Sequence, residues 1–329
     1  MAVIQNTGII EEKLQDSLAL WQGLENAQCT LINHTENATF RIDLTNGAKK
    51  IIRVHRSGYN SERAISSELT WAKALRVDAG VRTPVAIAGA NGCVIQTAVL
   101  GATDSAQFMV LFEYETGREP NENDDLVSSF SDLGRLAAIA HNHVQHWALP
   151  SEFERLLWDA QTILKSDGLW GDWRAAPGMC PEYRPIFDQL DALLRERLHK
   201  FGQDKQRFGL IHADMRLANL LIDGDKIKLI DFDDCGFGWY LYDFAAAISF
   251  IEDSPAIPAL KEAWLMGYRS ERELSKEDEA EIDTFIMLRR MALTAWIGSH
   301  NETPFAQSLA GDFVSRGAIL ARDYLIEFG

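Results

Sequence analysis

Cysteine is scarce in this 329-residue sequence, and its four cysteines form no C-x-x-C pair. This excludes a disulfide framework and a cysteine zinc site, and it indicates free thiols in a reducing compartment. A membrane-spanning segment is also missing, because the longest uncharged stretch, residues 83–103, contains Pro84 and several turn-forming residues. The first residues lack the basic start and apolar core of a signal peptide. We therefore expect a cytoplasmic protein without a membrane partner.

Basic residues are the minority among the charged side chains. The sequence has 32 Lys and Arg against 48 Asp and Glu, which gives a formal net charge of −16. Nucleic acid and anionic membranes would repel such a surface, so we expect neither as a partner. Residues 1–112 contain 10 basic and 10 acidic side chains, so the whole excess lies in residues 113–329. Solubility would explain this excess, and so would a positively charged ligand bound by the second part of the chain.

The hydrophobic pattern of residues 1–112 predicts a small antiparallel sheet with two helices. An amphipathic helix is expected over 8–24, and Ser61 would cap a second helix over 61–77. Asn46-Gly47 is typical of a type I′ hairpin turn. The strands of the sheet are expected at 29–33, 39–44, 50–54, 93–99 and 107–114.

Beyond a polar connector at 115–125, the pattern is mainly helical. One short hairpin, with strands at 220–222 and 226–230, interrupts the helices, and Asp223-Gly224 is typical of its turn. The chain is long enough for two lobes, each with its own core, since domains average about 150 residues. The helices are expected at 125–147, 151–165, 182–200, 241–251, 256–268, 276–299 and 305–327.

Polar residues on both sides of that hairpin carry the strongest functional signal. His212, Asp214 and Asn219 form an H-x-D-x-x-x-x-N pattern before it, and Asp231 follows its second strand. Because a hairpin returns the chain to the end where it started, Asp231 would lie beside Asn219. These two hard oxygen donors suit Mg²⁺, and Asp214 would project beside them to meet a hydroxyl group.

This arrangement resembles the aminoglycoside phosphotransferase-like branch of the protein-kinase-like superfamily. Protein kinases carry H-R-D-x-x-x-x-N followed by D-F-G. This chain has His212-Ala213-Asp214 and Asp231-Phe232-Asp233, the forms typical of the small-molecule branch, and Asp243 opens the next helix as it does there. The run as a whole is similar to homoserine-kinase-like enzymes and to a bacterial stress-response kinase.

The resemblance implies an α+β, bilobal, protein-kinase-like fold. Residues 1–112 would form the N-terminal nucleotide-binding lobe, and 113–117 would be the hinge. Residues 118–329 would form the C-terminal catalytic and acceptor-binding lobe. ATP and Mg²⁺ would be the cofactors, bound between the lobes.

The resemblance also implies cofactor contacts in the N-terminal lobe. Arg53 stands where kinases place the lysine that holds the ATP phosphates, and Glu68 stands where its partner glutamate belongs. Arginine keeps the charge and binds phosphate through two nitrogens, so we expect ATP binding to be retained; a surface ion pair of little energetic value is the alternative. No G-x-G-x-x-G loop exists, but Asn37 lies in a turn that resembles the phosphate-cradling turn of the branch. Glu113 and Tyr114 would begin the hinge that binds adenine.

Four further residues near the motif receive roles from the resemblance. Arg216 would contact the transferred phosphoryl group, with a salt bridge at the loop surface as the alternative. Asp233 would bind or orient the metal, or else cap local structure. His212 would orient the catalytic loop through a backbone hydrogen bond, and Asp243 would anchor that loop.

The implied activity is that of a kinase that transfers the γ-phosphate of ATP to a hydroxyl group of a small molecule. Asp214, Asn219, Asp231 and Arg216 would be its catalytic residues. A protein Ser/Thr kinase of the bacterial stress-response type is the alternative. However, Asp231 and Asp243 are only 12 positions apart and no A-P-E motif follows, which leaves little platform for a peptide. A nucleotide-binding pseudokinase is disfavoured because the polar catalytic residues are all present.

The acidity of residues 113–329 favours a cationic acceptor, such as an amino alcohol or an aminoglycoside-like compound. An anionic acceptor would need a basic pocket beside ATP, and Arg289-Arg290 is the only adjacent basic pair in the late helices. We expect one of these two arginines to face solvent. The acidic clusters that would attract a cation are Glu119, Glu122, Asp124, Asp125, Asp233, Asp234, Glu252 and Asp253.

Two other groups of residues are interpreted as structural. His141, His143 and His146 do not share one helical face and have no carboxylate or thiol near them in sequence, so no metal site is expected. Seven of the nine tryptophans lie beyond residue 113 and could line a cation cage. For each of them, packing in a helical core is the preferred interpretation.

Overall fold

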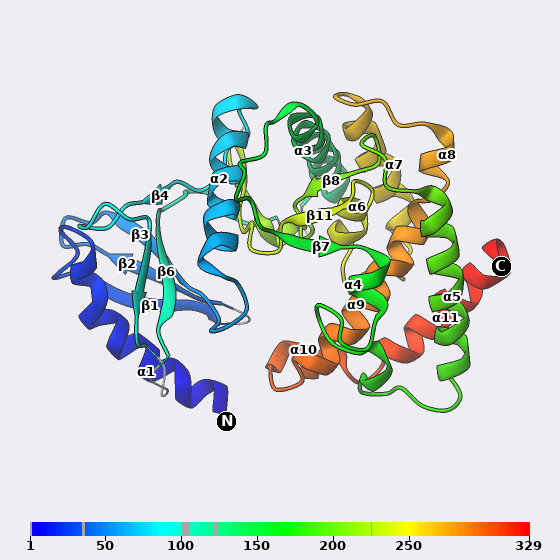
Figure 1. Cartoon of the computed structure of the whole chain (residues 1–329), viewed down its shortest axis with the longest axis horizontal. Helices are drawn as coiled ribbons and strands as arrows, with labels where there is room; N and C mark the ends of the chain where they lie inside the picture. Colours follow the sequence, from blue (N-terminus) through cyan, green and yellow to red (C-terminus); the bar gives the residue numbers. More distant parts are fainter. Residues whose placement is uncertain (1, 35–36, 101–104, 121–123, 225) are drawn as a thin grey trace. The chain divides into compact units, whose positions relative to one another are not determined.

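The computed structural model describes residues 2–34, 37–100, 105–120, 124–224 and 226–329 (Figure 1). They form two compact units. The N-terminal unit contains Met1–Gly117 and Pro150–Glu154, and the C-terminal unit contains Arg118–Leu149 and Arg155–Gly329. Residues 150–154 were assigned from the sequence to the C-terminal lobe. In the structure this segment returns to the N-terminal unit, where the Glu154 N–H donates to Ser67 Oγ at 3.0 Å.

The N-terminal unit is built on an antiparallel sheet with the strand order β1-β2-β3-β6-β4, and β5 also pairs with β6. Each of the five predicted strands is present. The additional strand, β4, has only two residues, which is too short for an alternating pattern to reveal. The strands are β1 (Gln28–His34), β2 (Ala38–Asp43), β3 (Lys49–Val54), β4 (Ala86–Ile87), β5 (Ile95–Ala98) and β6 (Gln107–Glu113).

The turn between β2 and β3 is not the predicted type I′ turn. A type I′ turn needs a positive φ at both central residues, but Gly47 has φ +84° while Asn46 is not among the residues with positive φ. The Gly47 N–H donates to the Leu44 carbonyl at 2.9 Å, and the Leu44 N–H donates to the Ala48 carbonyl at 2.8 Å. The loop is therefore one residue longer, with Gly47 in the left-handed position after the turn.

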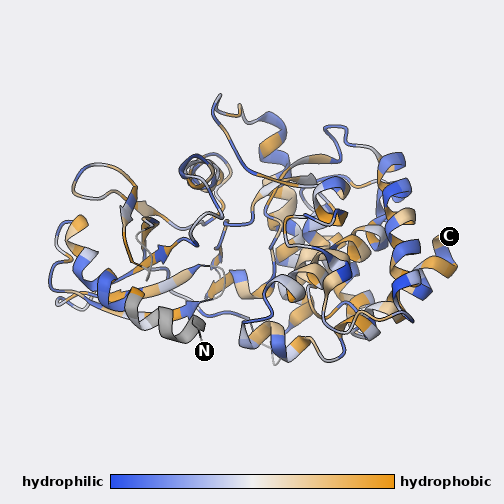
Figure 2. Cartoon of the chain, turned by 60° about the horizontal axis from the view of Figure 1, so that its bottom comes forward, coloured by the Kyte–Doolittle hydropathy of each residue, from blue (hydrophilic) through white to orange (hydrophobic). Residues whose placement is uncertain are grey.

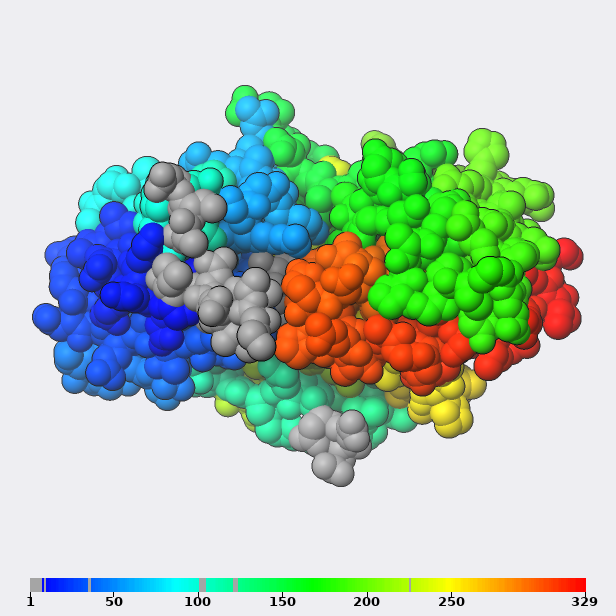
Figure 3. Space-filling view, turned by 90° about the horizontal axis from the view of Figure 1, so that it is seen from below, coloured from blue at the N-terminus to red at the C-terminus, as the bar shows by residue number. Residues whose placement is uncertain are grey.

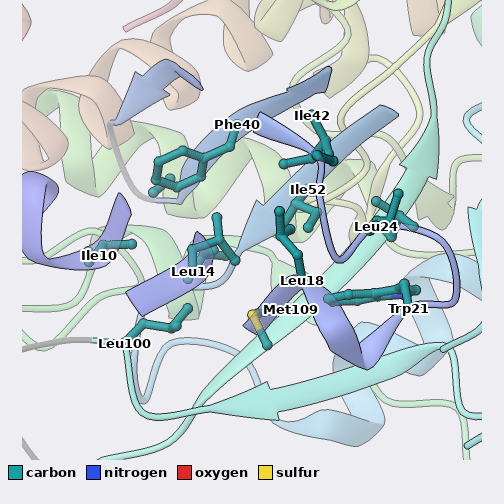
Figure 4. Close-up of a cluster of buried hydrophobic side chains, with 14 residues drawn as sticks. Ile10, Leu14, Leu18, Trp21, Leu24, Phe40, Ile42, Ile52, Leu100 and Met109 are labelled. Atoms are coloured by element: carbon teal, nitrogen blue, oxygen red, sulfur yellow. The ribbon is translucent and has the colours of Figure 1, made fainter. Parts of the chain in front are cut away.

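A hydrophobic core joins this sheet to the first helix, α1 (Ala2–Ser17), and the following 3₁₀ turn η1 (Leu18–Leu20). Figure 4 shows Leu14, Leu18 and Trp21 against Phe40 and Ile52 of the strands. All five side chains are buried. The predicted helix over 8–24 is thus shifted toward the N-terminus, and Trp21 reaches the core from an extended residue rather than from a helix.

The second helix of the N-terminal unit, α2 (Glu62–Asp78), begins where the sequence predicts. Ser61 is its N-cap, because its hydroxyl accepts a hydrogen bond from the Ala64 N–H at 3.0 Å. Trp71 and Leu75 are fully buried, and so is Ile65, which contacts Val110 of β6. This helix carries Glu68, so its packing against the sheet fixes the position of that carboxylate.

The C-terminal unit is mainly helical. Its outer helices carry hydrophilic residues on one side and hydrophobic residues on the other (Figure 2), and α10 lies at its surface, coloured orange in Figure 3. No helix among the described residues is long and apolar enough to cross a membrane. The helices are α3 (Leu126–His146), α4 (Ala160–Leu164), α5 (Arg184–Phe201), α6 (Tyr242–Ala247), α7 (Ile257–Arg269), α8 (Lys276–Glu279), α9 (Ile282–Ser299), α10 (Pro304–Leu309) and α11 (Phe313–Phe328), with 3₁₀ turns η2 (Trp173–Ala175) and η3 (Leu217–Asn219).

Helix α9 is the central element of this unit, because every residue from Thr284 to Ile297 is buried. It therefore contacts other elements on all sides, and any charged residue in it must find a partner inside the protein. The predicted helix at 276–299 is in fact two helices, α8 and α9. The predicted helix at 305–327 is likewise broken, at Gly311 and Asp312, into α10 and α11.

A three-stranded sheet in the C-terminal unit was missed by the sequence analysis. Its order is β7-β11-β8, and β11 pairs parallel with β7 and antiparallel with β8. The helix predicted at 151–165 is wrong except for α4, because Arg155 donates to the carbonyls of Asp233 and Cys235 and holds the chain extended. The strands are β7 (Leu156–Trp158), β8 (Phe208–Ile211), β9 (Leu220–Asp223), β10 (Lys226–Leu229) and β11 (Gly236–Trp239), of which β9 and β10 form the predicted hairpin.

Helices α3 and α7 approach each other closely through two glycines (Figure 1). A Cβ at Gly134 of α3 would overlap the backbone carbonyl of Trp264, and a Cβ at Gly267 of α7 would overlap the carbonyl of Ser131. Only residues without a side chain allow the two backbones to come this near. The contact fixes the relative position of the two helices.

Gly267→Ala tests this contact. Although alanine favours a helix, its methyl group has no space here, so we expect the free energy of unfolding to fall by about 1–3 kcal/mol. Gly311→Ala is the control, because nothing lies within 4 Å of its Cβ position, and it should change stability by less than about 0.5 kcal/mol. Urea unfolding measures both, and equal stability of the two variants would contradict the assigned role of the contact.

Candidate active site

The catalytic loop of the motif begins directly after β8 and is held by one buried carboxylate. Asp243, in the first turn of α6, accepts hydrogen bonds from the N–H of His212 at 3.2 Å and of Ala213 at 2.7 Å. Ala213 has φ +64°, a conformation that alanine rarely adopts. The two hydrogen bonds that Asp243 accepts stabilise this conformation, which turns the next residue, Asp214, out of the strand direction. Asp243 therefore anchors the loop, as predicted.

His141 of α3 supports that anchor. Its Nε2 lies 3.0 Å from Asp243 Oδ2, and its Nδ1 lies 3.0 Å from the hydroxyl of Tyr268 in α7. Burial lowers the pKa of His141 despite the neighbouring carboxylate. The neutral ring then donates from Nε2 to Asp243 and accepts from Tyr268 at Nδ1. The close contact of α3 with α7 thus brings Tyr268 within hydrogen-bond distance of the imidazole.

This role of His141 was not predicted from the sequence, where the residue was weighed only as a metal ligand. The signal was present in the helical period, because Leu133, Ala137 and His141 follow one another at intervals of four on the buried face of α3. Among the described residues, no three His, Cys, Asp or Glu side chains group as a metal site. His141 uses both ring nitrogens for Asp243 and Tyr268.

The carboxylate of Asp214 is surrounded by donors. Asn219 donates from Nδ2 to Oδ2 at 2.8 Å, and Arg216 donates from Nε to the same oxygen at 3.1 Å. Arg289 of α9 donates from Nη2 to Oδ1 at 3.0 Å. Burial raises the pKa of Asp214, but the charges of Arg216 and Arg289 outweigh it and hold that pKa below its usual range. The side chain is therefore an ionised, oriented hydrogen-bond acceptor.

Arg289 and Arg290 differ from the prediction, because both are buried and neither faces solvent. Arg290 donates from Nη1 to Glu252 Oε2 at 2.7 Å and from Nη2 to the Phe313 carbonyl at 2.7 Å. The expectation of a solvent-facing arginine was wrong because α9 is enclosed on all sides. Arg289 is the second site residue that the sequence analysis missed, since its contact with Asp214 spans 75 positions.

Arg216 is placed beside Asp214, and His212 takes the predicted orienting role. The Arg216 guanidinium forms an ion pair with Asp214 and keeps about a third of its side chain exposed, at 37%. The structure thus contains the salt bridge that was the alternative for this residue; contact with a phosphoryl group stays a prediction. The Nε2 of His212 lies 3.2 Å from the Ile230 carbonyl, which ties the loop to the segment before Asp231.

The hairpin brings the two proposed metal ligands to one end. The Ile230 N–H donates to the Asn219 carbonyl at 2.9 Å, so Asn219 and Asp231 lie on facing segments directly beside each other. Asp231 is exposed and has φ +60°, which Asp tolerates better than most residues. Asn219 uses its Nδ2 for Asp214, which leaves its Oδ1 for a cation.

These donors fit Mg²⁺, which is usually held by one or two carboxylates together with substrate phosphates. Asp233 is buried, and its backbone carbonyl accepts a hydrogen bond from Arg155. That contact places Asp233 in the anchored part of the turn before β11. Its proposed contact with the metal stays a prediction.

In the N-terminal unit, Arg53 and Glu68 form a buried ion pair. Arg53 Nη2 lies 2.5 Å from Glu68 Oε1, and the side chains are 9% and 3% exposed. The Arg53 guanidinium also lies over the ring of Phe112, 5.4 Å from its centroid. The alternative of a surface ion pair is therefore wrong, and the pair joins β3 to α2 inside the unit.

The other predicted nucleotide contacts lie at the strand ends of the same unit. Asn37 Oδ1 accepts a hydrogen bond from the Arg56 N–H at 3.0 Å; residues 35–36 of its turn lie outside the described residues. The Glu113 N–H donates to the Val85 carbonyl at 2.8 Å, and its carboxylate pairs with Lys50. Tyr114 is 39% exposed. An adenine contact at Glu113 would therefore have to use its backbone carbonyl.

Comparison with known proteins covers most of the chain. Residues 28–274 match the phosphotransferase enzyme family. Amicoumacin kinase of Bacillus subtilis (strain 168) is 24% identical over 294 residues, which are 86% of this chain and 83% of that protein. Homoserine kinase of Neisseria meningitidis serogroup B is 30% identical over 156 residues, 45% of this chain and 47% of its own length.

Solved structures extend this likeness to the fold. The microcompartment-associated aminopropanol kinase is 39% identical, with a TM-score of 0.89 over 96% of this chain and 98% of that one. Amicoumacin kinase hAmiN, solved with AMP-PNP and Ca²⁺, is 21% identical with a TM-score of 0.74, over 93% and 92% of the two chains. The predicted α+β, protein-kinase-like fold is confirmed by these structures.

Asp243→Asn tests the anchor of the loop. An amide has one acceptor oxygen, so at least one of the N–H groups that Asp243 binds loses its partner. We expect the free energy of unfolding to fall by about 1–3 kcal/mol and hydrogen exchange to accelerate in residues 208–216. Asp253→Asn is the control, because Asp253 pairs with Arg316 near the surface and should cost less than about 1 kcal/mol. Unchanged exchange in Asp243→Asn would contradict the anchoring role.

Proposed function

The chain belongs to the phosphotransferase enzyme family and is a kinase of small-molecule hydroxyl groups; from that premise we propose that its acceptor is a short amino alcohol such as an aminopropanol. The observation that carries this proposal is the 39% identity to the aminopropanol kinase over 96% of the chain. Two other relatives are named for small hydroxyl compounds, as kinases of homoserine and of amicoumacin.

Asp214 would receive the hydroxyl group of the acceptor. An ionised carboxylate with a lowered pKa is a weak base, so its main contribution is to orient the hydroxyl oxygen toward the phosphorus. The proton would move to Asp214 late, when the bond from the hydroxyl oxygen to the γ-phosphorus has formed, the bond from that phosphorus to ADP has broken and the hydroxyl has become acidic. This assignment agrees with the loose transition state of phosphoryl transfer, which needs positioning more than a strong base.

Asn219 and Asp231 would hold Mg²⁺, which neutralises charge on the phosphates when it is bound. Asn219 has a second task, because its amide N–H₂ also fixes Asp214 at 2.8 Å. One side chain thus couples the position of the acceptor group to that of the metal. Arg216 would add positive charge near the transferred group while its Nε stays on Asp214 Oδ2.

In the N-terminal unit, Arg53 would bind the ATP phosphates, oriented by Glu68. The guanidinium is fixed by the ion pair and by Phe112, so little side-chain entropy would be lost on binding. Asn37 would contribute to the phosphate-binding turn, and Glu113 and Tyr114 would contact adenine. These four assignments rest on the family resemblance and on the positions of the residues at the strand ends.

The alternative of a protein Ser/Thr kinase is disfavoured by the segment between Asp231 and Asp243. Its residues Gly236–Trp239 form β11, the middle strand of a three-stranded sheet, and Cys235 is fully buried. A peptide platform needs an extended, accessible segment at this place. The short, paired segment leaves no such platform.

The local acidic clusters give the amino alcohol less support than the sequence suggested. Asp124 pairs with Arg118, Glu252 with Arg290 and Asp253 with Arg316, so these carboxylates are neutralised by neighbours. Asp125 caps α3, and Glu122 lies outside the described residues. The argument from charge that remains comes from Glu119, Asp233 and Asp234, and from the net charge of −16, which acts at long range.

Arg53→Ala and Arg53→Lys test the phosphate contact. Loss of a charge-assisted contact should raise the KM for ATP in Arg53→Ala by about 10- to 100-fold, with less effect on the acceptor. Arg53→Lys keeps the charge and should recover part of that loss. Steady-state kinetics with varied ATP and varied acceptor separate the two effects. Equal losses in both variants would assign Arg53 to packing instead.

The acceptor is tested with a panel of an aminopropanol, ethanolamine, choline, homoserine and neutral propanediol. We expect the aminopropanol to have the highest kcat/KM, and Asp214→Asn to lower its turnover by roughly 10²–10⁴. The aminopropanol value should fall as ionic strength rises from ~10 to ~500 mM because attraction is screened, while the propanediol value should not. Phosphorylation of a sugar acid with inert amino alcohols would overturn the proposal.

A further inference from the structure

Arg289 is a buried cation whose three guanidinium nitrogens all have oxygen partners. Its Nε donates to Ser249 Oγ at 2.9 Å, its Nη1 donates to the Ala213 carbonyl at 3.1 Å, and its Nη2 donates to Asp214 Oδ1 at 3.0 Å. The residue is 1% exposed. One planar group thus connects α9, the segment after α6 and two successive residues of the catalytic loop.

Aromatic rings restrict the plane of this guanidinium. The ring of Trp170 lies 4.8 Å from the Arg289 guanidinium carbon, and the ring of Tyr242 lies 5.6 Å from it. Tyr242 and Trp158 stack with 5.9 Å between their centroids, and Trp158 meets Trp170 edge-on at 5.0 Å. The rings therefore support one another as well as the cation, and they hold Arg289 in a single orientation.

The hydrogen bonds to Asp214 leave one lone-pair site of its carboxylate for a substrate. An ionised carboxylate offers about four lone-pair sites, two on each oxygen. On Oδ2, Asn219 and Arg216 occupy both sites, and on Oδ1 Arg289 occupies one. One site on Oδ1 remains open among the described residues, next to the Arg289 donor.

We propose that Arg289 is a positioning residue that presents the open site of Asp214 Oδ1 to the acceptor hydroxyl. This inference rests on the proposed kinase function of the same site. By binding the Ala213 carbonyl and Asp214 Oδ1 together, Arg289 fixes the side chain relative to its own backbone. Without it, the carboxylate could rotate about its Cα–Cβ and Cβ–Cγ bonds, and the hydroxyl would be oriented for attack in fewer complexes.

The neighbouring Arg290 shows what a purely structural buried arginine looks like in the same helix. It pairs with Glu252 and binds the Phe313 carbonyl, and both of these partners lie outside the catalytic loop. Both arginines lose hydration on burial, and both would destabilise the fold if their charge lost its partner. Only the loss of Arg289 would also release Asp214, so the two residues form a matched pair for an experiment.

The experiment compares Arg289→Lys with Arg290→Lys in the full chain. Lysine keeps the charge but cannot form the three-way contact. Arg289→Lys should lower kcat by about 10- to 100-fold and leave the KM for ATP within about twofold. Both variants should lower the melting temperature by a similar amount, because each replaces a buried, paired arginine. The kcat of Arg290→Lys should nevertheless stay within about twofold of the parent value.

Chemical rescue provides a readout that a structural role would not move. In Arg289→Ala, added guanidinium ion should raise kcat by about 10-fold, because it can occupy the vacated site beside Asp214; in Arg290→Ala it should not. If the alanine variants do not fold, the kcat values of Arg289→Lys and Arg290→Lys provide the test instead. A parent-like kcat in Arg289→Lys, or equal losses of kcat in both lysine variants, would overturn the inference.

The acceptor panel, measured with the parent enzyme, tests the proposed substrate class independently of the role of Arg289. If the acceptor panel finds a hydroxyl compound other than an amino alcohol, the proposed substrate class is wrong. The comparison of the two lysine variants is then made with that compound. Arg289 would still have to act on kcat rather than on the KM for ATP.

Discussion

The position of the catalytic loop depends on one buried carboxylate, Asp243. It binds two backbone N–H groups of the loop and the imidazole of His141, which in turn contacts Tyr268. Those two side chains come from α3 and α7, whose distance is set by glycines at their crossing. The geometry around Asp214 therefore depends on Gly134 and Gly267, which allow the two helices to approach each other. A local motif of eight residues works only because long-range helix packing holds its anchor.

Features that depend on short stretches of sequence were predictable. The five longer strands of the N-terminal sheet, the Ser61 cap and the β9–β10 hairpin follow from alternation, capping and turn residues within a few positions. The proximity of Asn219 and Asp231 follows from the same hairpin. The Arg53–Glu68 pair came from family resemblance, and its burial became clear only from the packing of α2 on the sheet. The individual roles of these site residues remain predictions.

Features that depend on distant partners were not predictable. The strands β7, β8 and β11 are three or four residues long, and two of them contain glycine, so their pattern is too short to recognise. Arg289 was judged by its charge, which favours solvent, whereas its actual surroundings are set by α9 being enclosed on all sides. His141 was judged by its neighbours in sequence, but its partners lie more than 100 positions away.

The left-handed conformation of Ala213 has a consequence for heat tolerance. A residue with a side chain pays about 1–2 kcal/mol to adopt it, and here the hydrogen bonds of Asp243 and Arg289 offset that cost. The loop thus keeps an unfavourable backbone conformation through a few hydrogen bonds, whereas the helices around it are stabilised by an extensive hydrophobic core. On warming, local opening of the loop requires less free energy than unfolding of the unit. Loss of these few contacts on warming would release Asp214, and with it activity, while the helices are still folded.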